Sequence, residues 1–266
     1  MWDPTTYLTY GDLRARPFHE LVARVRAEAP RRVVDVGCGP GNLTRTVAQR
    51  WPQATVEAFD SSPEMVEKAR AAGLEAEVLD AREWTPWADT DVVISNATLQ
   101  WIPEHRELLR RWAGQLPAGA WLAMQVPGNF DAPSHVLARE LAASDRWRTR
   151  LGGAAPLGGP DTVSGAAEYA DLLADEGCSV EAWETTYVQP MDGPGAVLEW
   201  ITGTALRPVR AALGDADWEE FRGELGERLP GGYPARAGGG TGVPFPPGVV
   251  VVPAAPCTAG WSATLR

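Results

Sequence analysis

The stretch VVDVGCGPGN, residues 33–42, constrains the fold of this chain more than any other part of the sequence. It places three glycines and a proline within five positions, directly after a run rich in β-branched residues. Glycine inside regular structure costs roughly 0.5–1 kcal/mol relative to alanine, so this density needs a reason in the backbone itself. Either the chain turns sharply here, or a ligand comes very close to the backbone.

The surroundings of these glycines predict a strand, a tight turn and then a helix, because the segment that follows has helical spacing. In an open α/β sheet, ligands bind beyond the carboxyl ends of the strands, where helix amides add partial positive charge. The backbone can then lie close to a nucleotide-like ligand at Gly37, Gly39 and Gly41. Asp60, 19 residues after Gly41, is placed to bind ribose hydroxyls. The alternative is a tight turn with an unrelated acid.

The spacing of the glycines narrows the class of ligand. It is G-x-G-x-G, not the G-x-G-x-x-G of dinucleotide-binding folds, and no phosphate-binding lysine follows. An NAD-dependent oxidoreductase is therefore disfavoured. Asp35, two residues before the first glycine, would repel a phosphate but could orient an ammonium group. A cationic nucleoside such as S-adenosylmethionine fits this pattern best.

Strand-like and helix-like stretches alternate over the first two thirds of the chain. Segment 90–96, TDVVISN, is nearly all apolar, which is typical of a central parallel strand. This alternation predicts an α/β fold with a Rossmann-like, doubly wound, seven-stranded and mostly parallel sheet. The expected strands are segments 31–37, 54–60, 74–80, 90–96, 119–128, 179–190 and 249–252.

We expect a single domain over residues 1–252, with a core at roughly 30–128 completed by late strands. After Gly128 the pattern loosens into helices. Two late helical insertions, at roughly 129–176 and 191–232, are predicted to form a cap. The last fourteen residues, 253–266, are expected to be a disordered tail.

Composition excludes several classes of partner. Lysine and arginine total 24 and aspartate and glutamate 35, giving a net charge of −11, which disfavours nucleic acid or an anionic membrane surface. The three cysteines are far apart and lack C-x-x-C spacing, so neither a disulfide framework nor a metal site is expected. No stretch approaches 18 apolar residues. These features predict a cytoplasmic protein and leave the oligomeric state open.

Four segments, in order at the ends of successive predicted strands, resemble the motifs of class I S-adenosylmethionine-dependent methyltransferases. They are VVDVGCGPGNLT, FDSSPEMV, LDAREW and ISNATLQWI. The resemblance implies that Met65 lies near the adenine, that Asp80 accepts from its amino group, and that Ala81 presents its backbone amide. The cofactor-binding residues that it implies are Asp35, Gly37, Gly39, Gly41, Asn42, Asp60, Ser61, Met65, Asp80, Ala81 and Asn96.

A closer resemblance covers about residues 2–234. Four stretches are similar to segments of the trans-aconitate 2-methyltransferases. They are WDPTTYLTYGDLRARPF, SNATLQWIPEH, VPGNFDAPSH and AWETTYVQP. This implies methyl transfer to one carboxylate of trans-aconitate, giving a monomethyl ester by in-line displacement. A carboxylate is already ionised at neutral pH, so we expect positioning and no general base. Beyond residue 234 the chain reads VPFPPGVVVV where the family usually has an aromatic, arginine-containing final strand.

Binding a tricarboxylate inside an acidic protein requires local cations and hydrogen-bond donors. His135 and Arg207 are the first candidates, since the fork of an arginine suits a carboxylate. The N-terminal segment is expected to fold over the donor, with Tyr7 and Tyr10 at the substrate and Arg16 at the carboxylate of the donor. Packing or surface roles remain the alternative for these residues.

The segment after residue 96 is expected to wall the methyl donor, with Trp101 as a substrate-binding residue and a core position as its alternative. His19 and His105 are interpreted as helix-surface residues, and Cys38 as a packing residue in the glycine turn.

Two further functions stay open from the sequence. One is a carboxyl methyltransferase that acts on another small acid or on a malonyl carrier protein, although an acidic carrier would be repelled by a chain of this charge. The other is a module that binds the donor without turnover, which the altered C-terminal segment favours.

Overall fold

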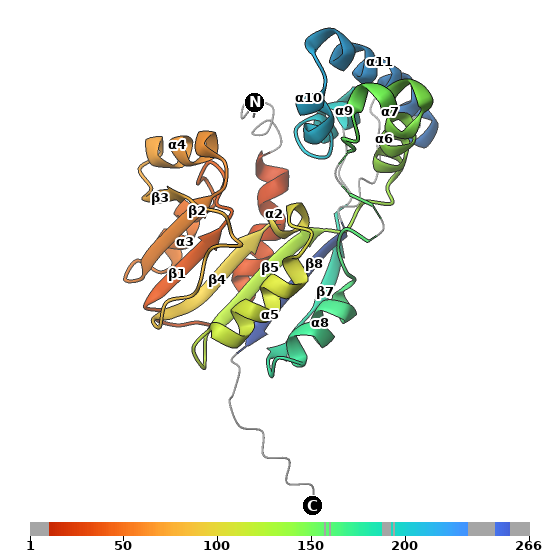
Figure 1. The fold of residues 1–266 in the computed structure, drawn as a ribbon. Coiled ribbons are helices and arrows are strands. Elements are labelled where there is room, and N and C mark those ends of the chain that lie inside the picture. The colour runs from red at the N-terminus through yellow and green to blue at the C-terminus, as the bar shows by residue number, and fades with distance from the viewer. Residues whose placement is uncertain are drawn as a thin grey trace, which may run out of the picture. The chain divides into compact units, whose positions relative to one another are not determined.

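A computed structural model describes residues 11–156, 158–159, 161–187, 193, 195–233 and 248–255, with the backbone alone at 11–14 and 248–255. The chain divides into two compact units (Figure 1). The sheet unit comprises Arg14–Val126, Ser164–Glu184 and Val249–Arg266. The helical unit comprises Met1–Leu13, Pro127–Val163 and Thr185–Gly248.

Five parallel strands form the main part of the sheet, in the order β3-β2-β1-β4-β5. The inner strands β1 and β4 carry continuous apolar runs that are buried along most of their length, as a parallel sheet covered on both faces requires. This confirms the predicted Rossmann-like parallel sheet. The strands are β1 (Arg32–Val36), β2 (Thr55–Asp60), β3 (Ala76–Val78), β4 (Thr90–Asn96) and β5 (Trp121–Pro127).

The predicted count of seven strands is wrong, because the described part of the chain already forms an eight-stranded sheet. Segment 179–190 was expected to be one strand, but it contains two short ones, β6 (Ser179–Val180) and β7 (Trp183–Thr186), and both pair with β8. The last strand, β8 (Gly248–Ala255), runs three residues past its expected end at 252 because it continues antiparallel to β6. The part of the predicted tail from 256 to 266 lies outside the described residues.

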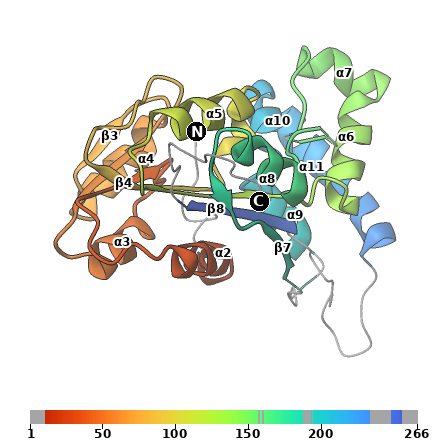
Figure 2. The ribbon, with the colours of Figure 1, turned by 90° about the horizontal axis from the view of Figure 1, so that it is seen from below.

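Helices cover both faces of the sheet. Figure 2 shows α2 (Gly11–Arg24) and α3 (Thr44–Arg50) on one face, with α5 (His105–Gln115) and α8 (Ala166–Ala174) on the other. The sequence analysis placed residues up to 176 in the cap, but α8 belongs to the sheet unit, where it packs against α5.

The helix α4 (Pro63–Ala71) begins as its sequence predicts. Ser62 is its N-cap, and the side chain of Ser62 accepts a hydrogen bond from the amide of Met65. Proline stands at the first helical position, where a missing N–H costs nothing. The start of α4, directly after β2, fixes the backbone that follows Asp60.

His105, predicted to lie on a helix surface, is buried at the start of α5. Its Nδ1 lies 2.8 Å from the carbonyl oxygen of Ile102 and its Nε2 lies 2.7 Å from the hydroxyl oxygen of Tyr169. A carbonyl oxygen can only accept, so Nδ1 carries the proton and Nε2 accepts from the tyrosine. Burial lowers the pKa of His105, which agrees with a neutral ring.

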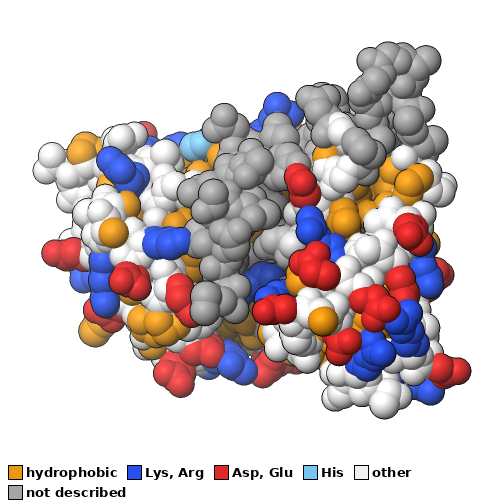
Figure 3. Space-filling model, turned by 90° about the horizontal axis from the view of Figure 1, so that it is seen from above, with side chains coloured by type: hydrophobic (Ala, Val, Ile, Leu, Met, Phe, Trp, Pro, Cys, Tyr) orange, Lys and Arg blue, Asp and Glu red, His pale blue; other side chains and the backbone are white. Residues whose placement is uncertain are grey.

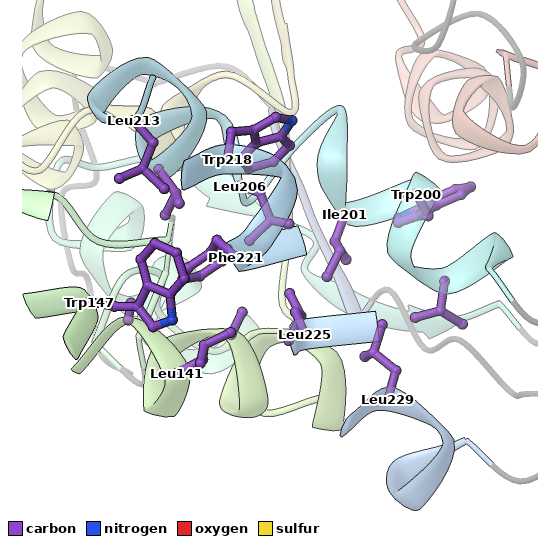
Figure 4. Packing of buried hydrophobic residues seen from close by; sticks show 14 of the residues in the cluster. Leu141, Trp147, Trp200, Ile201, Leu206, Leu213, Trp218, Phe221, Leu225 and Leu229 are labelled. Carbon is purple, nitrogen blue, oxygen red and sulfur yellow. The ribbon is translucent and has the colours of Figure 1, made fainter. Parts of the chain in front are cut away.

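The helical unit has a hydrophobic core of its own, shown in Figure 4. Trp147 and Phe221 meet edge to face with ring centroids 5.2 Å apart, and Leu141 and Leu225 pack in the same cluster. Within the predicted helical insertion at 129–176, segment 132–147 is divided into two helices at Ser144, which has extended backbone angles. The helices of this unit are α6 (Pro133–Ala143), α7 (Asp145–Leu151), α9 (Ala196–Thr202), α10 (Arg207–Ala212) and α11 (Asp215–Gly232).

The acidic residues of α11 are paired with arginines. Arg146 of α7 forms ion pairs with Glu220 and Glu224, and Arg150 contacts both Glu220 and Asp217. The arginines hold the pKa of the Glu220 carboxyl below its usual range. Figure 3 likewise shows basic and acidic side chains interspersed on the described surface in that view. Much of the acidic charge of α11 is therefore balanced locally.

Candidate active site

The glycine-rich stretch forms a turn that is tied to the end of β2. Gly37, Gly39 and Gly41 have φ angles of +75°, +56° and +80°, in the left-handed region that favours glycine. The amides of Gly37 and Cys38 both donate to the carbonyl oxygen of Phe59 at 2.9 Å. The turn predicted from the sequence is therefore confirmed.

The three glycines have different surroundings. A Cβ atom at Gly37 would lie 2.1 Å from Oγ1 of Thr98, and one at Gly41 would lie 2.3 Å from Cδ1 of Leu74. Packing within the protein thus excludes a side chain at these two positions. At Gly39 a Cβ atom would meet no atom of the described residues within 4 Å. The open space needed by a ligand close to the backbone is therefore at Gly39.

Asp60, at the end of β2, borders this open space. Its Oδ2 accepts a hydrogen bond from the amide of Gly39 at 2.9 Å, and its Oδ1 accepts one from the amide of Ser62 at the same distance. Each carboxylate oxygen can accept a second hydrogen bond. Asp60 thus holds the glycine turn and keeps the capacity to accept from ribose hydroxyls. Of the neighbouring candidates, Ser61 is exposed and Met65 is buried.

Asp80, which follows β3, is bound by Arg82. Nε and Nη2 of Arg82 donate to its two carboxylate oxygens at 3.0 and 2.6 Å, and the amide of Arg82 donates at 2.9 Å. The guanidinium lowers the pKa of the Asp80 carboxyl, so it stays an ionised acceptor. The sequence had not predicted this partner. Ala81, beside it, is buried.

Asp35 is buried within β1, with 3% of its surface exposed. Its Oδ2 accepts a hydrogen bond from the hydroxyl of Thr44 at 2.6 Å. Burial raises the pKa of Asp35 to about 6, and the nearby charge of Asp60 adds to the shift. Oδ2 of Asp35 therefore has a partner inside the protein, and the predicted contact of this residue with the donor stays a prediction.

The end of β4 combines unpaired polar atoms with an unusual backbone. Among the described residues, Oγ of Ser95, Oδ1 of Asn96 and Oε1 of Gln100 are buried and lack hydrogen-bond partners. Ala97, between them, has a φ of +53°. An unpaired buried polar group costs about 1–3 kcal/mol, so such a concentration is typical of a ligand site. The sequence analysis missed Ser95 and Gln100, although polar residues directly after an apolar strand could have indicated them.

Thr98 joins the end of β4 to the glycine turn, because its Oγ1 donates to the carbonyl oxygen of Gly37 at 3.4 Å. The structure therefore brings together the predicted residues Gly37, Gly39, Asp60 and Asn96 at one edge of the parallel sheet. Trp101 ends the short 3₁₀ helix η1 (Leu99–Trp101) that follows and is half-buried.

Two other predicted donor-binding residues, Asn42 and Arg16, are exposed, the former after the glycine turn and the latter on α2. Tyr7 and Tyr10 lie outside the described residues. These four positions stay predictions.

In the helical unit, His135 lies in the first turn of α6 and is 5% exposed. Burial lowers the pKa of His135 to about 4, and the charge of Arg139 adds to the effect. The ring is therefore neutral near pH 7, so it can donate a hydrogen bond but does not supply the cation that a tricarboxylate needs.

Arg139 is a cation that the sequence analysis missed, although its i, i+4 spacing from His135 could have indicated it. It donates to the carbonyl oxygens of Phe130 and Gly158 at 2.7 and 3.1 Å. Arg207 begins α10 and is half-buried. Arg210, one turn later, pairs with Asp215 at 2.6 Å.

S-adenosylmethionine, the donor expected from the sequence, fits the features of the sheet unit. A nucleoside needs an acceptor for its ribose, which Asp60 supplies, and close approach to a backbone, which Gly39 allows. Oxygen atoms that have no hydrogen-bond partner suit a cationic ligand, and three of them lie at the end of β4.

Two searches of the described residues were negative. They contain no group of three or more His, Cys, Asp or Glu side chains that could hold a metal ion. None of the described helices is both long enough and apolar enough to cross a membrane.

Comparison with known proteins identifies the family of the chain. A family model described as a methyltransferase domain matches residues 10–183. A Rhodococcus jostii protein named trans-aconitate 2-methyltransferase is 61% identical over 245 residues, covering 92% of this chain and 96% of the relative. A protein of the same name from Mycobacterium tuberculosis is 52% identical, covering 92% of this chain and 94% of the relative.

Solved structures share the fold at low sequence identity. The YcgJ protein of Bacillus subtilis superposes with a TM-score of 0.56 at 15% identity, covering 91% of this chain and 98% of that one. A Haloferax volcanii putative methyltransferase, solved with the methyltransferase activator Trm112, gives a TM-score of 0.51 at 20% identity, covering 96% of this chain and 95% of that chain. At these identities the likeness supports the fold alone.

Proposed function

This chain belongs to the methyltransferases and, among them, to the trans-aconitate 2-methyltransferase family, and from that premise we propose that it methylates one carboxylate of trans-aconitate. S-adenosylmethionine is the methyl donor, and when bound it would supply a sulfonium methyl group that a carboxylate oxygen attacks in line. The O–CH3 bond would form as the S–CH3 bond breaks, and S-adenosylhomocysteine would leave. The product is a monomethyl ester.

The observation that carries the donor half of this proposal is the arrangement of Asp60 around the glycine turn. Its carboxylate fixes the amide of Gly39 and has acceptor capacity left for ribose hydroxyls. Asp80 is the acceptor proposed for the adenine amino group. At the end of β4, Asn96 and Gln100 offer oxygen atoms to the cationic end of the donor.

The acid is proposed to bind through groups of the helical unit. Arg139 and Arg207 supply positive charge, and the neutral ring of His135 supplies an N–H donor. Tyr7, Tyr10 and Trp101 remain candidate contacts from the sequence. The substrate carboxylate is ionised near pH 7, so the work of these residues is to orient it and to exclude water, with no general base required.

The experiment that tests the proposal is transfer of a radiolabelled methyl group from S-adenosylmethionine to a panel of acceptors. The panel contains trans-aconitate, cis-aconitate, citrate, isocitrate and a malonyl carrier protein. We expect base-labile label on trans-aconitate, because a methyl ester hydrolyses in base. An Asp60→Ala variant, which should lose the donor, is the negative control.

Each alternative predicts a different result. Label on the carrier protein or on another acid would replace the proposed substrate and keep the reaction. Binding of S-adenosylmethionine by calorimetry without label on any acceptor would contradict turnover and favour the donor-binding module. A cytoplasmic location and a lack of nucleic-acid partners stay predictions from the sequence.

A further inference from the structure

A series of hydrogen bonds in the helical unit ends at His135. The hydroxyl of Tyr233, at the end of α11, donates to Oγ of Ser134 at 3.0 Å. The backbone amide of Ser134 donates back to Oη of Tyr233, also at 3.0 Å. Oγ of Ser134 lies 3.3 Å from Nδ1 of His135. All three side chains are buried, so water does not compete for these bonds.

The direction of these bonds follows from counting protons. Tyr233 has one hydroxyl proton, and the acceptor that the structure records for it is Oγ of Ser134. The hydroxyl proton of Ser134 is then free for its other recorded neighbour, Nδ1 of His135. A neutral imidazole that accepts at Nδ1 carries its own proton on Nε2.

The structure records no hydrogen-bond partner for Nε2 of His135 among the residues that it describes. An N–H group at this atom is therefore able to donate to a ligand. The ring lies in the first turn of α6, where the helix dipole favours a negative charge, and Arg139 adds a positive charge one turn later. These surroundings suit a carboxylate oxygen.

We propose that Tyr233 and Ser134 are positioning residues that hold His135 in its Nε2–H tautomer, so that its ring donates a hydrogen bond to a carboxylate of the acid substrate. This rests on the proposed function. In the opposite tautomer Nε2 would present a lone pair and repel that carboxylate, so the tautomer itself decides whether the acid binds.

The tautomer can be observed directly by nitrogen-15 NMR of the imidazole rings. The chain has three histidines, which removal one at a time assigns, and His105 is an internal reference with the proton on Nδ1. We expect the ring of His135 to be neutral and protonated on Nε2 at pH 7. In the variants Ser134→Ala and Tyr233→Phe we expect a mixture of both tautomers. A ring protonated on Nδ1, or a tautomer that neither variant changes, would overturn the inference.

Kinetics provide the second readout. We expect Ser134→Ala and Tyr233→Phe to raise the KM for trans-aconitate about tenfold, the low end for a hydrogen bond to a charged group, with kcat changed less than twofold. Ser134→Thr, which keeps the hydroxyl, should restore the KM. Binding of S-adenosylhomocysteine by calorimetry should be unchanged in all three variants.

The matched control is Tyr169→Phe, which removes a tyrosine hydroxyl from the other buried histidine, His105. It should destabilise the protein without raising the KM for trans-aconitate. An equal rise in KM in this control would mean that lost stability causes the effect and would overturn the inference. A wild-type protein that methylates no acid would contradict the proposed function and the substrate role of His135 together. Methylation with His135 protonated on Nδ1 would contradict this inference alone.

Discussion

Asp35 couples the stability of the donor-free protein to pH. Its pKa is raised from 3.8 to about 6 because the carboxyl is buried, so the folded state binds its proton more tightly than the unfolded state does. Proton binding by Asp35 stabilises the folded state fully when the pH is below the pKa of the unfolded state. This stabilisation is lost as the pH rises through about 6. A shift of this size is worth about 3 kcal/mol.

The variant Asp35→Asn should remove this dependence and keep the hydrogen bond from Thr44, since the amide oxygen still accepts. We expect the wild-type free energy of unfolding, relative to the variant, to fall by about 2 kcal/mol between pH 4 and pH 7. Urea unfolding at several pH values measures it. The control is the same change at the partly exposed Asp89, whose pKa is lowered by its hydrogen bond with Arg32, so its effect on the pH dependence should have the opposite sign. Parallel curves for wild type and Asp35→Asn would contradict the assignment.

Residues whose roles depend on nearby sequence were predictable, and those with distant partners were not. Asp60 could be identified by its spacing from the glycines, because the length of one helical crossover fixes that spacing. The burial of His105 depends on Tyr169, 64 positions later, and local patterning carries no information about it. For the same reason His135 could be proposed from its segment, but its partnership with Tyr233 could not.

At the level of the element, different glycines of the glycine turn are expected to serve packing and ligand binding. Gly39→Ala introduces a methyl group into open space at a φ of +56°, so it should cost about 1 kcal/mol of stability from backbone strain. The methyl group would occupy the space proposed for the donor. We expect the Kd for S-adenosylmethionine to rise at least about tenfold, since overpacking costs about 1–3 kcal/mol.

The control for Gly39 is Gly73, which has a φ of +85° and also has no described neighbour for an added Cβ, but lies at the end of α4, outside the glycine turn. Gly73→Ala should cost similar stability and leave donor affinity unchanged. Gly41→Ala, whose Cβ would overlap Leu74, should lower the melting temperature more than either. Equal donor affinities for Gly39→Ala and Gly73→Ala, measured by calorimetry, would show that the open space at Gly39 is not used.

The helices of the helical unit depend on their own core. Phe221 is fully buried against Trp147, so Phe221→Ala should cost about 3–5 kcal/mol, whereas Phe221→Leu should cost less than about 1.5 kcal/mol. Because the donor-binding residues lie in the sheet unit, we expect Phe221→Ala to impair trans-aconitate turnover at temperatures where donor binding persists. Thermal scans with calorimetry test this, and a simultaneous loss of both would mean that the units do not unfold separately.

Over the whole molecule, the parallel half of the sheet was predictable and the antiparallel end was not. β1 and β4 each contain a short run of buried apolar residues bounded by turns, and this pattern is typical of parallel strands covered on both faces. β6 and β7 are short, and segment 179–190 alternates in polarity as one strand would. The segment forms two strands that both pair with β8, about seventy residues later in the chain. No local pattern could reveal this pairing.

The position of β8 in the sheet leads to a prediction about the stability of the whole fold. β8 lies between β5 and the pair β6 and β7, so it joins the parallel part of the sheet to its antiparallel end. Ending the chain after residue 247 would expose the edge of β5 and remove the partner of both short strands. We expect a melting temperature lower by more than about 5 °C, or an insoluble protein, because several backbone hydrogen bonds are lost together.

Two further variants distinguish loss of the strand from loss of the residues that follow it. Ending the chain after Ala255 keeps β8 and should leave the melting temperature within about 2 °C of that of the full chain. Val251→Pro removes a backbone N–H from the middle of β8, and an internal strand tolerates this poorly, so it should resemble the shorter chain. If the chain ending at 247 melted like the full protein, β8 would contribute nothing to the sheet. If the chain ending at 255 were the unstable one, the residues after it would be part of the fold.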